Sequence, residues 1–287
     1  MPVLLMTVWL TGCVQEELGS TPSPAGNGIR FTLTVPDVNL PSVSSRTMTG
    51  TGTAKKEDEI ETVDILVFDM SKTPAVYLEC VSATGVTQDL ADNSTVSFSA
   101  VLSPTTASTC IVVVANKELD NIVPGFIKGT TTKVEAMEKM LHAQTGKWLA
   151  DGSTTDGYTR IPMYGEKVIS KITPSMDPIT GINMKRMLAR IDIRNNSATS
   201  NFTVEEVYLA NYNTTGYIAP AWNTNGQVID PAPDTPVLPV NSGKMTEEGD
   251  AILYSVNGNT PYEGEIYTFE SIAAEDVGGV GQDGEAS

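Results

Sequence analysis

One cysteine near the start of the chain has the neighbours of a lipid-modification site. Residues Val3 to Leu10 are apolar except for Thr7 and lead directly into Leu10-Thr11-Gly12-Cys13. A small residue before the cysteine gives a signal peptidase access to the backbone, and the thiol can carry a diacylglyceryl group. The apolar stretch is too short to span a bilayer as a retained helix. We therefore expect a lipoprotein signal peptide over residues 1–13 and lipid on Cys13.

The residues on the two sides of this segment favour different interpretations. No Lys or Arg precedes the apolar run, so the true start of the signal peptide is left open, and a buried N-terminal strand with an incidental cysteine is the alternative. Glu16 and Glu17 follow the cysteine closely. That placement resembles the export signal of surface lipoproteins in Bacteroidetes-type bacteria.

A second candidate for chemistry is Arg46, as a site of proteolysis. It lies between Ser45 and Thr47 in a segment, residues 36–56, that is rich in Ser, Thr and Gly. An arginine in such an exposed stretch is accessible to a trypsin-like protease. Before it, residues 29–35 alternate between apolar and polar, which predicts a half-buried strand. The apolar face of that strand consists of Ile29, Phe31, Leu33 and Val35.

Motifs for catalysis and cofactor binding are missing. The sequence has no G-x-S-x-G elbow, and His142 is its one histidine, which leaves few ways to activate a serine or cysteine. Residues 145–148 lack the upstream Gly and the following Ser/Thr of a phosphate-binding loop. Residues 279–284 match G-x-G-x-x-G by letter but lie in an acidic tail with no helix to follow. We expect neither an enzyme nor a cofactor.

Metal ligands are also not spaced for a site. The three cysteines have no zinc-type spacing, and residues 151–157 resemble a calcium loop without its Gly position or closing Glu. Cys80 and Cys110 lie on predicted strands; a disulfide between them is one interpretation, and two separately buried thiols is the favoured one. The chain has many acidic residues, and their number alone does not show whether two of them form the carboxylate pair of a glycosidase. A carbohydrate-active enzyme therefore stays as an open alternative.

Charge excludes one large class of partner. The 287 residues hold 18 Lys plus Arg and 35 Asp plus Glu, a formal net charge of −17. Such a chain offers no basic field for a phosphate backbone, so nucleic acid is not expected as a partner. After Arg194 the only basic residue is Lys244, against 14 acidic residues. This half is a solvated acidic surface or, alternatively, a functional anionic patch.

The elements that must position these residues are mostly strands. Besides residues 29–35, the apolar patterns predict strands at 61–69, 75–81, 96–102, 110–115, 184–193, 204–210, 251–256 and 265–269. One helix is predicted, because Thr132 and Glu135 fit a capping box and Val134, Met137 and Leu141 form an apolar stripe. Gly146 is placed to end the helix, with His142 solvated or capping near that end.

Many short strands with turn-rich joints indicate antiparallel β-sandwich domains. We place a boundary near residue 178. The expected parts are the signal peptide at 1–13, a tether and removable strand at 14–46, an N-terminal domain at 47–178, a C-terminal domain at 179–270 and an acidic, Gly-rich tail at 271–287.

In their order along the chain, these features resemble the fimbrillin family of Bacteroidales, the subunits of major and minor fimbriae. The matching stretches are Leu10 to Cys13, Ile29 to Val35, Ser45 to Thr47, Val63 to Asp69, Ile111 to Asn116, Ile161 to Gly165, Lys185 to Asp192 and Tyr267 to Glu270. The resemblance covers nearly the whole chain.

The resemblance implies a mainly β protein of two transthyretin-like sandwich domains with one short helix in the first. It further implies a cell-surface or outer-membrane lipoprotein, anchored through Cys13, cut after Arg46 and joined to other fimbrial subunits by strand exchange. Removing the strand 29–35 would uncover an apolar groove with unpaired backbone groups, which a strand of another subunit can fill.

The chain departs from the family after Tyr267 to Glu270, where family members continue with the strands that supply the donor. Here residues 271–287 are acidic and Gly-rich. Two interpretations follow: a sequence that is truncated or frameshifted at its end, with an incomplete second domain, or a subunit that accepts a strand without donating one. A different class of function stays open as well, a permanently lipid-anchored surface protein that binds a glycan or a host protein.

Overall fold

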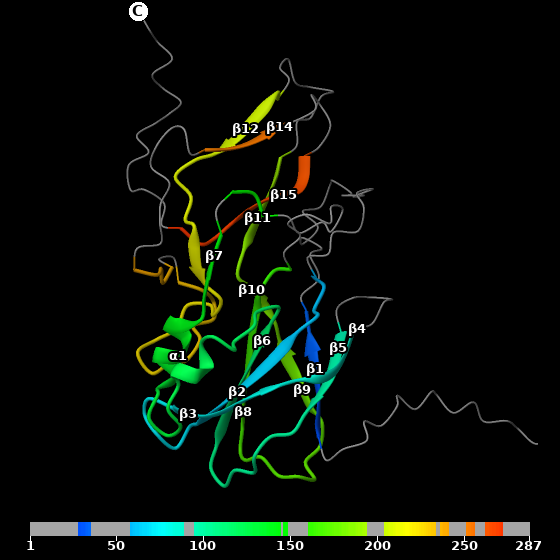
Figure 1. Cartoon of the computed structure of the whole chain (residues 1–287), viewed down its shortest axis with the longest axis vertical. Helices are drawn as coiled ribbons and strands as arrows, with labels where there is room; N and C mark the ends of the chain where they lie inside the picture. Colours follow the sequence, from blue (N-terminus) through cyan, green and yellow to red (C-terminus); the bar gives the residue numbers. More distant parts are fainter. Residues whose placement is uncertain are drawn as a thin grey trace, which may run out of the picture.

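The computed structural model describes residues 28–35, 58–88, 95–144, 146–148, 160–193, 204–233, 236–240, 251–255 and 262–271. The predicted fold class is confirmed, since the chain is mainly β, with antiparallel pairing dominant and a single α-helix in the described part (Figure 1). Nine strands between residues 29 and 186 form two sheets that pack face to face as a sandwich.

The first sheet has four strands in the order β4-β5-β1-β9. They are β1 (Ile29–Thr34), β4 (Thr84–Gln88), β5 (Thr95–Ala100) and β9 (Ile179–Asn183). β1 runs antiparallel to β5 and parallel to β9. The predicted removable strand is therefore an internal strand of this sheet.

The second sheet has five strands in the order β10-β8-β6-β2-β3. They are β2 (Val63–Asp69), β3 (Val76–Ser82), β6 (Thr109–Ala115), β8 (Met163–Ile169) and β10 (Lys185–Arg186). Every residue of β6 is buried, because both faces of this sheet are covered. The prediction that residues 61–69 form a strand apolar on both faces at its centre is confirmed by β2.

The core has one layer on each side of the second sheet. Alternate residues of β2 and β6, such as Ile65 and Val113, face the first sheet and pack with the apolar side of β1. Their neighbours Leu66 and Val112 face the other way, onto α1 (Lys133–Lys139) and residues from the second half of the chain. Figure 1 shows α1 on this outer side, next to β3.

The helix begins as predicted and ends earlier than predicted. The Thr132 side chain accepts from the Glu135 backbone and the Glu135 carboxylate accepts from the Thr132 backbone, which completes the capping box. The helix closes at Lys139, so Gly146 does not end it. Leu141 instead starts β7 (Leu141–Ala143), because its backbone pairs with β13 (Thr215–Tyr217) in an interaction that local sequence does not encode.

This pairing also corrects the prediction for His142. The residue lies in β7, half-buried, with its ring centroid 4.9 Å from that of Trp148, and is not a solvated residue at a helix end. Burial lowers the pKa of His142 to about 4, and the charge of Lys117 lowers it further. The folded protein therefore holds a neutral imidazole at neutral pH.

We expect His142 to make the folded protein sensitive to mild acid. The unfolded chain takes up the proton near pH 6.5 whereas the folded chain resists until about pH 4, so stability is complete above pH 6.5 and falls as the pH drops toward 4. After allowance for solvent screening the loss is roughly 1 kcal/mol. Thermal melts at pH 7.5 and 5.5 should show a smaller shift for His142→Gln than for wild type; equal shifts would contradict this.

The second half contributes two further strand pairs. β11 (Ala189–Ile193) pairs with β15 (Tyr262–Thr268), and β12 (Glu206–Leu209) pairs with β14 (Ile252–Ser255), each antiparallel. Gly216 leaves room for Phe269, because a Cβ there would lie 2.5 Å from the Phe269 ring. Phe269 in turn meets Trp148 edge to face, and together they connect the second half to the sandwich.

The predicted single strand at 184–193 is divided in the structure. Met184 is fully buried where the chain crosses from the first sheet into the second, and Met187 turns into the outer core layer. β9 and β10, which follow the predicted boundary near residue 178, thus belong to the same two sheets as the strands before it. The division into two domains stays a prediction. Within the described ranges no helix has the length and apolar character needed to cross a membrane.

Candidate functional site: the position of the first strand and its surroundings

β1 lies between β5 and β9, and we call this position the β1 site. The apolar face of the strand points toward the second sheet. Ile29, Phe31, Leu33 and Val35 are all buried, with Leu33 completely inaccessible. Phe31 stacks on Phe98 of β5 with ring centroids 4.9 Å apart and planes 7° from parallel. Full burial of a large apolar side chain contributes about 1.5–3 kcal/mol. The predicted apolar face is therefore a substantial part of the core.

Backbone hydrogen bonds hold both edges of β1. Its residues pair in continuous register with β5, from Ile29 opposite Ala100 to Thr34 opposite Thr95. On the other edge the pairing with β9 contains one irregularity between Phe31 and Leu33. The carbonyl oxygen of Thr34 also accepts from the Met184 amide at 2.8 Å. A chain without β1 would leave two unpaired strand edges facing each other across an apolar floor.

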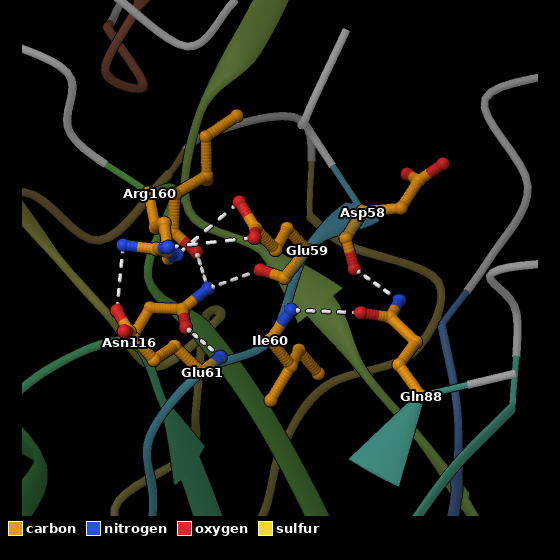
Figure 2. Close-up of polar contacts among 8 residues, drawn as sticks. Asp58, Glu59, Ile60, Glu61, Gln88, Asn116 and Arg160 are labelled. Carbon is orange, nitrogen blue, oxygen red and sulfur yellow. Dashed lines mark hydrogen bonds and ion pairs between the residues drawn. The ribbon is translucent and has the colours of Figure 1, made fainter. Parts of the chain in front are cut away.

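Residues 58–61 approach the Thr34 end of the β1 site, and we call them the anchored segment. Gln88, the last residue of β4, binds them through both ends of its side-chain amide (Figure 2). Its Oε1 accepts from the Ile60 amide at 3.1 Å and its Nε2 donates to the Asp58 carbonyl at 2.7 Å. The Gln88 amide thus does for this segment what a neighbouring strand would do.

Asn116 provides the same pairing from the opposite side. Its Oδ1 accepts from the Glu61 amide at 3.0 Å, and its Nδ2 donates to the carbonyl oxygens of Glu59 at 2.7 Å and Ile161 at 3.0 Å. Asn116 ends β6 with a φ of 58°, a left-handed conformation that asparagine tolerates better than most residues. The two amide side chains together satisfy four backbone groups of the anchored segment.

Two arginines add charge pairs around this segment. Arg160 lies 3.3 Å from Glu59 through Nε and 2.6 Å from Glu61 through Nη1. Arg186 of β10 binds the Asp58 carboxylate, with both side chains mostly buried. Between these polar contacts the Ile60 side chain is 5 % exposed and joins the core layer that contains β1. The arrangement binds the backbone of residues 58–61 and fixes its position.

The predicted site residues fall into two groups. Cys13, Arg46 and Thr47 lie outside the described residues, as do the calcium-like loop 151–157 and residues 279–284. The four strand residues are brought together on one face. Sequence reasoning missed Gln88, Asn116, Arg160 and Arg186. Isolated polar residues at strand ends give no periodic signal, so only the alternating strand could be found in advance.

Cys80 and Cys110 are free thiols, on β3 and β6, with β2 between those strands. The two thiols are separate, as the favoured interpretation expected, but only Cys110 is buried and Cys80 is half-buried. Burial raises the pKa of both thiols to about 12, so neither is a thiolate nucleophile near neutral pH. Among the described residues, no three His, Cys, Asp or Glu side chains group in a way that could hold a metal ion.

The family model for the major fimbrial subunit protein FimA matches residues 29–186. The chain belongs to this family. The matched residues begin with β1 and end with β10, and so contain both sheets of the sandwich. The FimA family is one of structural fimbrial proteins rather than enzymes, and membership implies a place in a cell-surface fimbrium, assembly with other fimbrial subunits and a structural role.

Solved structures similar to this FimA-family chain are distant. A fimbrial assembly protein from Parabacteroides distasonis is 14 % identical with a TM-score of 0.38, covering 83 % of this chain and 85 % of that one. A candidate cell adhesion protein from the same organism is 16 % identical with a TM-score of 0.46, covering 88 % and 73 %. Candidate polysaccharide-binding proteins from Bacteroides thetaiotaomicron are 11 % identical with a TM-score of 0.35. That match covers 70 % of this chain and 62 % of the other. No curated protein sequence matches.

Proposed function

We propose that this chain is a structural subunit or accessory adhesin of a cell-surface fimbrium that is exported as a lipoprotein, cut after Arg46 and assembled by strand exchange at the β1 site. The observation that carries the proposal is the position of β1. It is an internal strand with a fully apolar inner face, and residues 36–57 are its covalent link to the rest of the sandwich.

The proposed cut changes how β1 is held without touching its contacts. A tethered strand returns to its site at an effective concentration on the order of mM, and this advantage disappears once the link is cut. β1 is then held by noncovalent contacts alone and competes with any strand of similar pattern. Backbone hydrogen bonds supply affinity in such an exchange, and the pockets of alternate side chains supply specificity.

Lipid on Cys13 would hold the exported chain at the outer membrane before the cut. The cut breaks the covalent link between the sandwich and both this acyl anchor and β1, because both precede Arg46. When a strand of another subunit then displaces β1, the subunit leaves its anchor and its acceptor site is filled.

Limited proteolysis of the purified chain tests the cut. A protease that cuts only after arginine is expected to leave a stable core that begins at Thr47, and Arg46→Gln should abolish that product. The described arginines Arg160 and Arg186 provide internal controls, because both are largely buried in ion pairs and should resist. Digestion throughout the sandwich, or an uncut residue 46, would contradict the proposal.

A further inference from the structure

The first sheet depends on β1 for its continuity. In the order β4-β5-β1-β9, β1 is the strand that joins β5 to β9 through backbone hydrogen bonds. When β1 leaves, the β4-β5 pair and β9 become the two separate walls of the site. Nothing within that sheet then fixes the distance between them, and apolar walls without a partner tend to close on each other.

At the Thr34 end the anchored segment contacts one wall directly and is connected to the other through the chain that follows β9. On one side Gln88 belongs to β4, and it lies opposite Val96 of β5, which lies opposite Leu33. On the other side Arg186 belongs to β10 of the second sheet, and Met184 and Lys185 connect it to Asn183, the last residue of β9. Asp58 contacts both Gln88 and Arg186, since its backbone carbonyl accepts from the Gln88 amide and its carboxylate pairs with Arg186.

The partners Gln88 and Arg186 both lie outside β1. Asn116 and Arg160 fix the same segment to β6 and to the start of β8 in the second sheet. The hydrogen bonds of Gln88 and Asn116 satisfy half-buried backbone groups of Asp58, Glu59 and Ile60, and a half-buried group that is left unpaired is destabilising. These contacts therefore hold residues 58–61 in place when β1 leaves its site.

We propose that residues 58–61 act as a brace across the Thr34 end of the β1 site, holding the β4-β5 pair and β9 one strand-width apart so that the strand of a second subunit enters a preformed site. The proposal rests on the proposed strand exchange. A preformed site binds more tightly than one that must first be opened, because the ordering cost has already been met in the free protein.

The test uses the full chain, nicked at a recognition sequence for a site-specific protease that replaces residues 47–53, so that it does not depend on cutting at Arg46. The nicked chain is diluted until the noncovalently held β1 fragment dissociates, and a fluorescent synthetic peptide of residues 28–35, in excess over that fragment, is titrated in to measure its half-saturating concentration. The double variant Gln88→Ala with Arg186→Gln removes both of these side-chain contacts of the anchored segment. The matched control is Thr87→Ala with Lys185→Gln, whose side chains contact Ser97 and Asp230.

The brace variant is expected to need about tenfold more peptide than wild type and the control pair, equivalent to the loss of one good polar contact. The Ile60 and Glu61 amides should stay protected from hydrogen exchange while peptide replaces β1. Equal peptide binding in all variants, or loss of protection at Ile60 and Glu61 together with β1, would overturn the brace and leave strand exchange standing. A nicked wild type that never takes up peptide would overturn both.

Reduced peptide binding could also come from a misfolded variant, so folding is measured in the same samples. Protection of the β6 amides in the uncut variants must match wild type. Asp58→Asn, which removes the charge pair with Arg186 but keeps the Gln88 hydrogen bonds, is a milder second variant and should fall between wild type and the double variant.

Discussion

Replacing Phe31 by alanine is expected to lower the free energy of unfolding of the uncut chain by about 3–5 kcal/mol, the usual range for removing a buried phenylalanine. The ring is 1 % exposed and stacks on Phe98, so its loss leaves a cavity between β5 and the second sheet. Urea denaturation followed by tryptophan fluorescence measures the change.

The control for Phe31→Ala lies on the same strand. Thr34 is exposed, and its backbone carbonyl, which alanine keeps, accepts from the Met184 amide. Thr34→Ala should therefore change stability by less than about 0.5 kcal/mol. If Phe31→Ala is equally mild, β1 is not part of the core, and the idea that its removal opens a strong acceptor site fails with it.

Lys133→Met is expected to destabilise the chain by about 3–5 kcal/mol, because it leaves a carboxylate without its cation in a largely buried place. Lys133 is 2 % exposed, and its Nζ lies 2.6 Å from Glu166 Oε2. Tyr164 donates its hydroxyl to the same oxygen at 2.6 Å. Burial, with the Glu166 charge beside it, raises the pKa of Tyr164 well above its usual value, so the hydroxyl stays a donor.

A double variant separates the lost charge from lost packing. Lys133→Met with Glu166→Gln removes both charges and should recover most of the stability, since an amide can still accept from Tyr164. Lys128→Met, at an exposed lysine, is the control for the substitution itself and should be nearly neutral. If the double variant is as unstable as Lys133→Met alone, the loss comes from packing of the Lys133 stem and not from an unpaired carboxylate.

Local pattern was enough to predict the elements that carry the core. Alternation over residues 29–35 found β1, continuous apolar residues found β2 and β6, and the Thr132 and Glu135 pair found the helix start. In each case the signal lies within a few consecutive residues and reflects burial or a local hydrogen bond, which sequence encodes directly.

What sequence did not reveal depends on contacts between distant residues. β4, β9 and β13 are short and rich in Thr, Gly or Asn, so nothing in them alternates strongly. The helix end was misplaced because β7 pairs with β13 far along the chain. The anchored segment is the clearest case: Arg160 and Glu59 are 101 residues apart, and neither carries a pattern that points to the other.

The mature N-terminus of the protein on cells tests the central proposal most directly. Material sheared from the cell surface as fimbriae is separated from the membrane fraction, and the first residue of the chain in each is read by mass spectrometry. Strand exchange after processing predicts that the assembled chain starts at Thr47 and that peptides from residues 29–35 are missing from it. An assembled chain that still begins at a lipid-bearing Cys13 and retains β1 would contradict the account and favour a permanently anchored surface protein.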